Sequence, residues 1–248
     1  MSVISVITPA YNPEPEYLAA AWESLRTQDL PAGWELEWVV QEDGPTRQAE
    51  DILGADPRIV HGRGRHGGVS LARNLGLARS RGTLIKNLDQ DDVLLPGVLT
   101  RDISHIDDHV AWTTSRALDL MPDGTQVLSG SDPEHGPLLP GMVLQHWRQR
   151  GHRLPVHPTT ICVRRDLLVA LGGWMAVPGS DDTGMLIAAS QVSTGFFEGE
   201  TGLLYRKWPG QAAADPGHYD PEEWNLRMSL IAERGEAIRT LLCHEAAM

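Results

Sequence analysis

Three carboxylates in the middle of the chain are the residues best placed to do chemistry. Asp89, Asp91 and Asp92 come directly after residues 84–88, a short apolar run that indicates a strand. Burying an ionised carboxylate is costly, and crowding several raises the cost unless a cation neutralises them. If the chain turns at Gln90, Asp89 and Asp91 converge, and two such hard oxygen ligands suit Mg²⁺ or Mn²⁺. A solvated acidic loop is the alternative for this segment taken alone.

The segment before these carboxylates is strongly basic. Residues 57–88 contain no Asp or Glu but hold seven basic side chains, namely Arg58, Arg63, Arg65, Arg73, Arg79, Arg81 and Lys86. A metal–diphosphate site needs both features, because arginine and backbone amides bind phosphate oxygens while carboxylates bind the metal. Several of these arginines, Arg79 and Arg81 above all, are instead expected to be exposed charges on a helix surface.

Strand and helix signals alternate in the first half of the chain. Strands are predicted at 3–7, 34–40, 59–60 and 84–88, and helices around 18–25, 47–53 and 69–77. Such alternation implies βαβ units with a parallel sheet and right-handed crossovers. Ligands of such sheets bind beyond the carboxyl ends of the strands. The turn clusters that begin at Thr8, Gln41 and Asp89 are therefore expected to line one crevice.

The second half of the chain is less regular. Strands are predicted at 110–114 and 124–128, a loop at 133–140, a rigid turn at 155–160 that enters a strand, a helix near 165–171, and a short helix that opens at Asp181 and Asp182. Asp220 and Pro221 are typical of the start of a last helix. Its apolar stripe indicates packing in the core or in a homo-oligomer, and consists of Trp224, Met228, Ile231, Ile238 and Leu242.

Composition excludes several classes of protein. A net charge of −12 argues against a general nucleic-acid binder, whose affinity depends on neutralising phosphates. No apolar run approaches the ~20 residues of a membrane helix. The first residues look like a strand rather than a signal peptide, and two cysteines form no disulfide framework. A cytoplasmic protein without a transmembrane segment is expected.

Four segments, taken in order, resemble the family-2 glycosyltransferases of GT-A fold. They are residues 5–12, an opening strand and nucleotide loop; 39–44, a strand that ends in an acidic residue; 68–76, with an Ala-Arg-Asn helix; and 89–92, an Asp-x-Asp metal motif. The resemblance implies an α/β, Rossmann-like fold with a mostly parallel central sheet flanked by helices and a C-terminal acceptor-side region. Residues 1–108 would form the nucleotide-sugar half and 109–248 the acceptor half of one compact domain.

This resemblance also implies a donor site for a nucleotide-diphospho sugar, with UDP favoured. Its expected residues are Pro9, Ala10, Tyr11, Asp43, Arg65, Arg73, Asp89 and Gln90. Asp43 would accept the imide N–H of uracil, and Arg65 or Arg73 would contact phosphate. Asp91 would ligate Mn²⁺ or Mg²⁺, with Asp89 on ribose or a metal-bound water. A structural role for Arg73, pinning its helix to an acidic neighbour, is the alternative.

On the acceptor side, residues 179–182 resemble the family's acidic pair. Asp182 is the expected catalytic base, with Asp181 the second candidate; a helix N-cap is the alternative. His157 would touch sugar or acceptor, or pack in its loop. One departure is Trp208, which stands where the family often carries a histidine. Because indole cannot coordinate a metal, metal binding would be weaker, or His218 would substitute.

The implied activity is inverting transfer of a hexosyl group to a small-molecule or saccharide acceptor. A phosphatase of the haloacid-dehalogenase type, with Asp89 as nucleophile, is one alternative. Three strand–turn segments precede Asp89, and no lysine lies where that family needs one, which disfavours it. A nucleotidyltransferase is disfavoured because its glycine-rich phosphate loop is missing. A non-catalytic module that binds sugar nucleotides would keep Asp43, Asp89 and Asp91 without needing a base at Asp182.

Overall fold

A computed structural model of the chain describes residues 1–128, 132–211 and 216–245. The strands are β1 (Ser2–Ala10), β2 (Trp34–Glu42), β3 (Ile59–Gly62), β4 (Leu84–Asn87), β5 (Val93–Leu94), β6 (Val110–Leu120), β7 (Gln126–Val127), β8 (Gly136–Leu138), β9 (Cys162–Arg164) and β10 (Thr194–Arg206). The helices are α1 (Pro15–Arg26), α2 (Gln48–Leu53), α3 (Val69–Arg79), α4 (Val98–His105), α5 (Met142–Gln149), α6 (Arg165–Ala170), α7 (Asp181–Val192) and α8 (Pro221–Glu245), with 3₁₀ turns at Pro158–Thr160 and Pro216–Tyr219.

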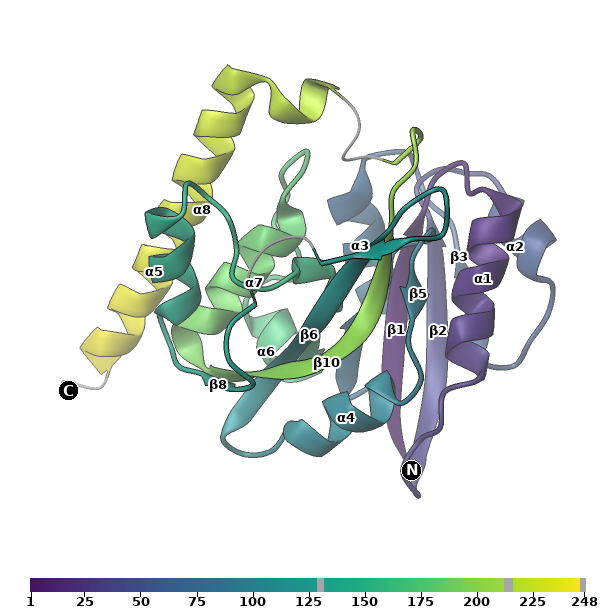
Figure 1. The fold of residues 1–248 in the computed structure, drawn as a ribbon, viewed down its shortest axis with the longest axis horizontal. Coiled ribbons are helices and arrows are strands. Elements are labelled where there is room, and N and C mark those ends of the chain that lie inside the picture. Colours follow the sequence, from purple (N-terminus) through teal and green to yellow (C-terminus); the bar gives the residue numbers. More distant parts are fainter. Residues whose placement is uncertain (129–131, 212–215, 246–248) are drawn as a thin grey trace.

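One twisted sheet runs through the molecule (Figure 1). Its strand order is β3-β2-β1-β4-β9-β6-β10-β5, with β7 added to β6 and β8 to β10. The first four strands are parallel, as predicted, and β6 and β10 form a second parallel pair. The short strand β9 is antiparallel to both β4 and β6, so it joins the two parallel groups. The predicted α/β architecture with a mostly parallel central sheet is confirmed.

Alternating residues of the central strands divide the core into two layers. Val6, Trp38 and Val40 pack with α1, α2 and α4, whereas Ile7 and Val39 pack with α3, α5, α7 and α8. Successive side chains of a strand point to opposite faces of the sheet, which explains the division. The sheet is therefore covered by helices on both faces, and Figure 1 shows α8 along the outside, beside α5 and α7.

The first strand is longer than its apolar run predicts. It continues through Pro9 and Ala10, which pair with Gln41 and Glu42 of β2. Pairing with β4 ends at Ile7, and Ala10 already accepts a hydrogen bond from Asp43 on the β2 side. By alternation, Pro9 faces the side that β4 has left, so no partner requires its missing N–H. A proline that indicates a turn in the sequence is thus accommodated in the strand.

Predictions for the second half were partly wrong. The predicted loop at 133–140 contains β8, which pairs with β10, and β6 extends well beyond residue 114. Met228 and Ile231 of α8 are buried in the core, as the apolar stripe predicted. The side chain of Leu242 in that stripe lies outside the described residues. Within the described chain, no helix has the length and apolar character needed to cross a membrane.

Candidate active site

The turns at the carboxyl ends of β1, β2 and β4 meet at one edge of the sheet, as predicted. Gln90, after β4, bridges to the backbone of Tyr11, after β1: its Oε1 accepts from the Tyr11 N–H at 2.9 Å and its Nε2 donates to the Tyr11 carbonyl at 3.1 Å. The Asp43 N–H donates to the Ala10 carbonyl at 2.7 Å. The predicted donor residues at these three turns are therefore neighbours.

Asp43 organises the loop that leads into α3. Its two carboxylate oxygens accept the backbone N–H groups of Gly67 and Gly68 at 2.7 and 2.9 Å. Gly68 has a φ of +92°, a conformation that favours glycine. The His66 ring lies 3.0 Å from Asp43 and stacks on Tyr11, with ring centroids 4.8 Å apart. Tyr11 remains 56% exposed, so this pair offers an open aromatic surface beside the carboxylate.

Arg73 connects the two groups of predicted site residues. From the interior of α3, its guanidinium donates to Asp89 Oδ1 at 2.6 Å and to Asp181 Oδ2 at 2.8 Å. The Arg73 side chain is 4% exposed and that of Asp181 is 3% exposed. The neighbouring carboxylates hold the pKa of Arg73 above its usual range despite burial. The structural role considered for Arg73 is therefore real, and it brings Asp181 to the donor-side carboxylates.

The end of β10 covers Asp91 and Asp92. The Trp208 indole N–H donates to Asp91 Oδ2 at 2.5 Å. The backbone N–H of Arg206 donates to Asp92 Oδ1 at 2.9 Å, and its guanidinium donates to the Asp91 carbonyl at 2.8 Å. Burial, then the charges of Asp91 and Asp89, raise the pKa of Asp92 well above its usual value. Asp92 thus holds its loop to β10.

The two acidic residues that open α7 have different surroundings. Burial raises the pKa of Asp181 to about 6, against the opposing effect of Arg73. Asp182 is less buried, and its Oδ1 accepts the Thr183 N–H at 2.6 Å. Burial also raises the pKa of Asp182. Of the pair, Asp181 is committed to an ion pair, whereas no side chain of the described residues beyond the adjacent Thr183 donates to Asp182.

The donor set at Asp89 and Asp91 fits a hard divalent cation. The ligating atoms are carboxylate oxygens, and Asp92 Oδ2 beside them is buried without a hydrogen-bond partner, which leaves one acceptor of the cluster unsatisfied. No cluster of three His, Cys, Asp or Glu side chains able to hold a metal occurs among residues 1–128, 132–211 and 216–245. A cation here would therefore have Asp91 and Asp89 as protein ligands and take other oxygens from water or phosphate.

His157 packs in its loop rather than facing an open space. Its ring lies 4.6 Å from that of Tyr205, and burial lowers the pKa of His157 to about 4. The neighbouring Thr159 hydroxyl is 3.5 Å from Asp89 Oδ2. The rigid turn at 155–160 therefore borders the acidic cluster, although its histidine is neutral at physiological pH.

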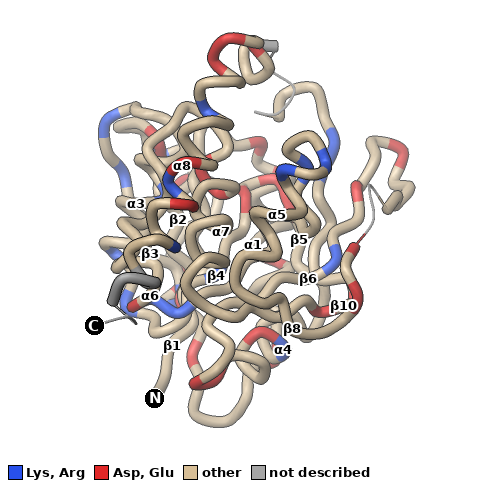
Figure 2. Tube along the Cα trace, turned by 90° about the vertical axis from the view of Figure 1, so that its left-hand side faces the viewer, with Lys and Arg blue, Asp and Glu red and all other residues tan. Residues whose placement is uncertain are grey.

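The basic side chains of residues 57–88 do not gather at the site as a whole, and Figure 2 shows Lys and Arg spread over the molecule. Lys86 is fully buried and pairs with Asp102 at 2.8 Å. Arg58 pairs with Asp56, and Arg81 with Glu37. Arg79 and Arg81 are exposed, as expected, although Arg81 follows α3 rather than lying on it. Besides Arg73, the exposed Arg65 lies in the loop between β3 and α3 and has no ion-pair partner among described residues; its phosphate contact stays a prediction.

Sequence reasoning missed His66 and the contact between Lys86 and Asp102. Both depend on residues that are distant in the chain, and nothing in their local patterns indicates the partner. Trp208 was recognised as unusual, but its contact with Asp91 was not predicted.

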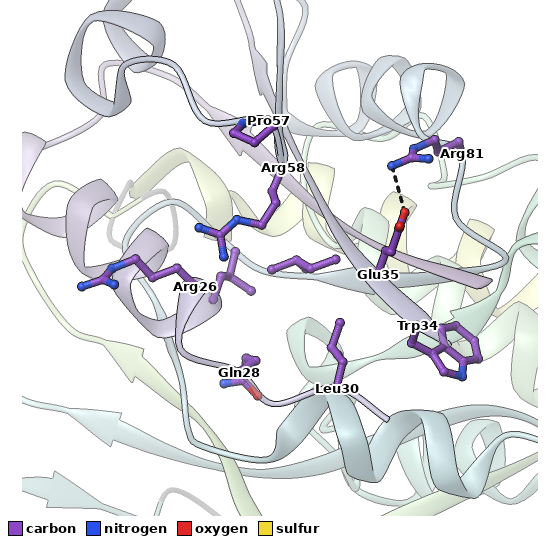
Figure 3. A pocket seen from close by; sticks show the side chains of 10 residues that line it. Arg26, Gln28, Leu30, Trp34, Glu35, Pro57, Arg58 and Arg81 are labelled. Atoms are coloured by element: carbon purple, nitrogen blue, oxygen red, sulfur yellow. Dashed lines mark ion pairs between the residues drawn. The ribbon is translucent and has the colours of Figure 1, made fainter. Parts of the chain in front are cut away.

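A cavity of about 420 Å³ lies away from these carboxylates (Figure 3). It is lined by Leu25, Arg26, Gln28, Leu30, Trp34, Glu35, Leu36, Pro57, Arg58 and Arg81. Trp34 begins β2, whereas Glu42 ends it, so this cavity lies toward the amino ends of the parallel strands. Ligands of such sheets bind at the other edge.

A model of the family described as glycosyl transferase family 2 matches residues 5–164. The chain belongs to glycosyl transferase family 2. The match contains Asp43, Asp89 and Asp91, Arg73 and the turn with His157. It ends before α7, so the roles of Asp181 and Asp182 depend on the geometry.

Curated relatives of this family-2 chain support the assignment over part of their length. It is 36% identical over 103 residues to the "Uncharacterized glycosyltransferase EpsJ" of Bacillus subtilis, covering 40% of this chain and 29% of that protein. It is 30% identical over 113 residues to an "N-acetylglucosaminyltransferase" of Bradyrhizobium elkanii, covering 42% of this chain and 60% of that protein. Each match spans less than two thirds of the relative.

A solved structure shows the same fold. The S. aureus TarS crystal structure in complex with UDP-GlcNAc superposes with a TM-score of 0.72 at 20% identity, covering 94% of this family-2 chain and 66% of that one. The GT-A-like architecture therefore extends into the second half of the chain, beyond the residues that the family model matches.

Proposed function

We propose that this chain is an inverting glycosyltransferase that moves a hexosyl group from a UDP-sugar to an acceptor hydroxyl. The observation that carries the proposal is the Arg73 bridge. It joins Asp89, at the predicted donor site, to Asp181, at the start of α7, and so places a second acidic pair beside the first. Family membership and the names of the relatives, which include an N-acetylglucosaminyltransferase and a UDP-GlcNAc complex, favour this donor class.

Asp182 is the proposed general base. Asp181 Oδ2 accepts a hydrogen bond from the Arg73 guanidinium, so the Asp181 carboxylate is already paired with a cation. Asp182 has a raised pKa and is less buried. It would take the proton of the acceptor hydroxyl as the oxygen attacks the anomeric carbon.

The donor side would bind the nucleotide diphosphate. Asp43 retains lone pairs beyond its two backbone bonds, because an ionised carboxylate offers about four acceptor positions. It would accept a base N–H next to the Tyr11–His66 stack. A Mn²⁺ or Mg²⁺ ion at Asp91 and Asp89 would supply positive charge for the diphosphate leaving group. The nucleotide base, the sugar, the acceptor, the oligomeric state and the cytoplasmic setting stay predictions.

The phosphatase alternative gains no support from the site. Asp89 would be its nucleophile, but Oδ1 is bound by the buried guanidinium of Arg73 and Oδ2 lies near Thr159. The remaining alternative is a non-catalytic module that binds the donor. The experiment below distinguishes it from an enzyme.

The test pairs Asp182→Asn with Asp181→Asn. We expect Asp182→Asn to lower transfer from a panel of UDP-sugars by roughly 10²–10⁴-fold, the usual contribution of a general base. UDP binding with Mn²⁺, measured by calorimetry, should stay within about twofold of wild type. Equal losses of transfer and binding would make Asp182 a scaffold residue. Donor binding by wild type without transfer to any acceptor would favour the binding module.

A further inference from the structure

Trp208 occupies one oxygen of the proposed metal ligand. Its indole N–H lies 2.5 Å from Asp91 Oδ2. Within the described residues it is the only group of another residue that donates to this carboxylate. An indole N–H is a donor without a lone pair for a cation. Trp208 therefore uses one of the two lone pairs of this oxygen, and a cation that binds the same oxygen must share it with the indole N–H.

The indole is held in this position from several sides. Its ring meets Tyr17 edge-on, with centroids 5.4 Å apart, and the Arg206 guanidinium covers the same Tyr17 ring at 4.2 Å. The Trp208 backbone N–H donates to Gln211 Oε1 at 3.1 Å. Arg206 is tied to both Asp91 and Asp92. The contact between Trp208 and Asp91 is thus part of a packed segment, and breaking it disturbs several neighbours.

We propose that Trp208 is a positioning residue that competes with the divalent cation for Asp91 and so lowers the cation affinity of this chain. The inference rests on the proposed function, which makes Asp91 the metal ligand. With the indole in place, Asp91 Oδ1 carries no donor from another described residue, whereas Oδ2 is shared with the indole N–H. A cation that takes both oxygens competes with the indole N–H for the negative charge on Oδ2. Removing the N–H frees the second oxygen.

The experiment titrates Mn²⁺ by calorimetry, alone and with saturating UDP, into wild type and Trp208→Phe. Phenylalanine keeps a ring against Tyr17 but has no N–H. Since a hydrogen bond to a charged group contributes about one to two powers of ten in an equilibrium constant, Mn²⁺ should bind Trp208→Phe roughly tenfold more tightly. The matched control, Trp34→Phe at the far end of β2, should leave Mn²⁺ affinity unchanged.

Equal or weaker Mn²⁺ binding by Trp208→Phe, or no Mn²⁺ binding by either protein, overturns the inference. If Trp208→Phe does not fold, Gln211→Ala loosens the segment and should shift the affinity in the same direction by a smaller factor. The proposed function fails separately: wild type that binds Mn²⁺ but no UDP would refute the donor assignment, while the titration with Mn²⁺ alone still tests Trp208.

Discussion

Replacing Arg73 by methionine should destabilise the protein strongly and in a pH-dependent way. Methionine has a similar length but no charge, so two carboxylates within 2.8 Å of the guanidinium lose their cation. Breaking a buried ion pair by removing one partner costs about 3–5 kcal/mol, because the remaining charge stays buried. Asp181 is almost fully buried, whereas Asp89 is 25% exposed and partly screened. We expect a loss near the lower end of that range at pH 7.5.

The pH dependence follows from Asp181. Its pKa in the folded protein, about 6, already exceeds the usual 3.8. A carboxyl group with a raised folded pKa binds more protons in the folded state, so stability rises as pH falls through that pKa. Without Arg73 the pKa of Asp181 rises further. The difference in unfolding free energy between wild type and Arg73→Met should therefore shrink between pH 7.5 and pH 5.

Urea unfolding at both pH values measures this difference. Arg79→Met is the control, since Arg79 lies on the same helix, is exposed, and among the described residues its side chain bonds to Gln41 and the Arg63 carbonyl. This substitution should cost less than about 1 kcal/mol. Adding Asp181→Asn to Arg73→Met should recover part of the loss, because contacting residues couple. A loss below 1 kcal/mol for Arg73→Met, or the same loss at both pH values, would refute the reasoning.

Two further predictions concern the stability contributed by His157 and by Gly195. The pKa of His157 falls from 6.5 to about 4 on folding, so stability should drop as pH falls through that window, by at most about 3 kcal/mol. His157→Phe, which keeps a ring against Tyr205, should flatten the profile of urea unfolding between pH 7 and 4.5; parallel profiles would contradict this. A Cβ at Gly195 would lie 2.3 Å from the fully buried Trp112 indole, so Gly195→Ala should cost about 1–3 kcal/mol and lower the melting temperature. An unchanged melting temperature would contradict that packing.

The first half of the fold could be predicted because its pattern is local. The alternation in β2 and the helical spacing in α1 are set by which face each side chain buries. The end of β1 could not be predicted, since Pro9 is tolerated only because β4 has diverged there. The strand β8 was missed for a related reason: three residues carry no period, and pairing with β10 alone makes them a strand.

The residue types of the candidate site could be predicted from the sequence, but the pairing of its charges could not. The sequence placed seven basic residues beside three carboxylates and suggested that they balance. Lys86 follows the same strand pattern as its neighbours, yet it is buried against Asp102, which the sequence gives no reason to select. Of the seven basic residues, Arg73 contacts two of the acidic residues of the site, Asp89 and Asp181. Its structural role could be recognised only from the position of Asp181 beside it.

That balance bears on how a donor would bind. Arg73 contacts Asp89 and Asp181, while Asp91 receives a neutral N–H and Asp182 a backbone N–H. The cluster therefore holds more negative than positive charge before any diphosphate arrives. Like charges a few ångströms apart repel strongly where water is scarce. In the proposed function these carboxylates would attract a divalent cation that offsets the charge of the diphosphate. The neutral indole at Asp91 would limit how tightly that cation is held.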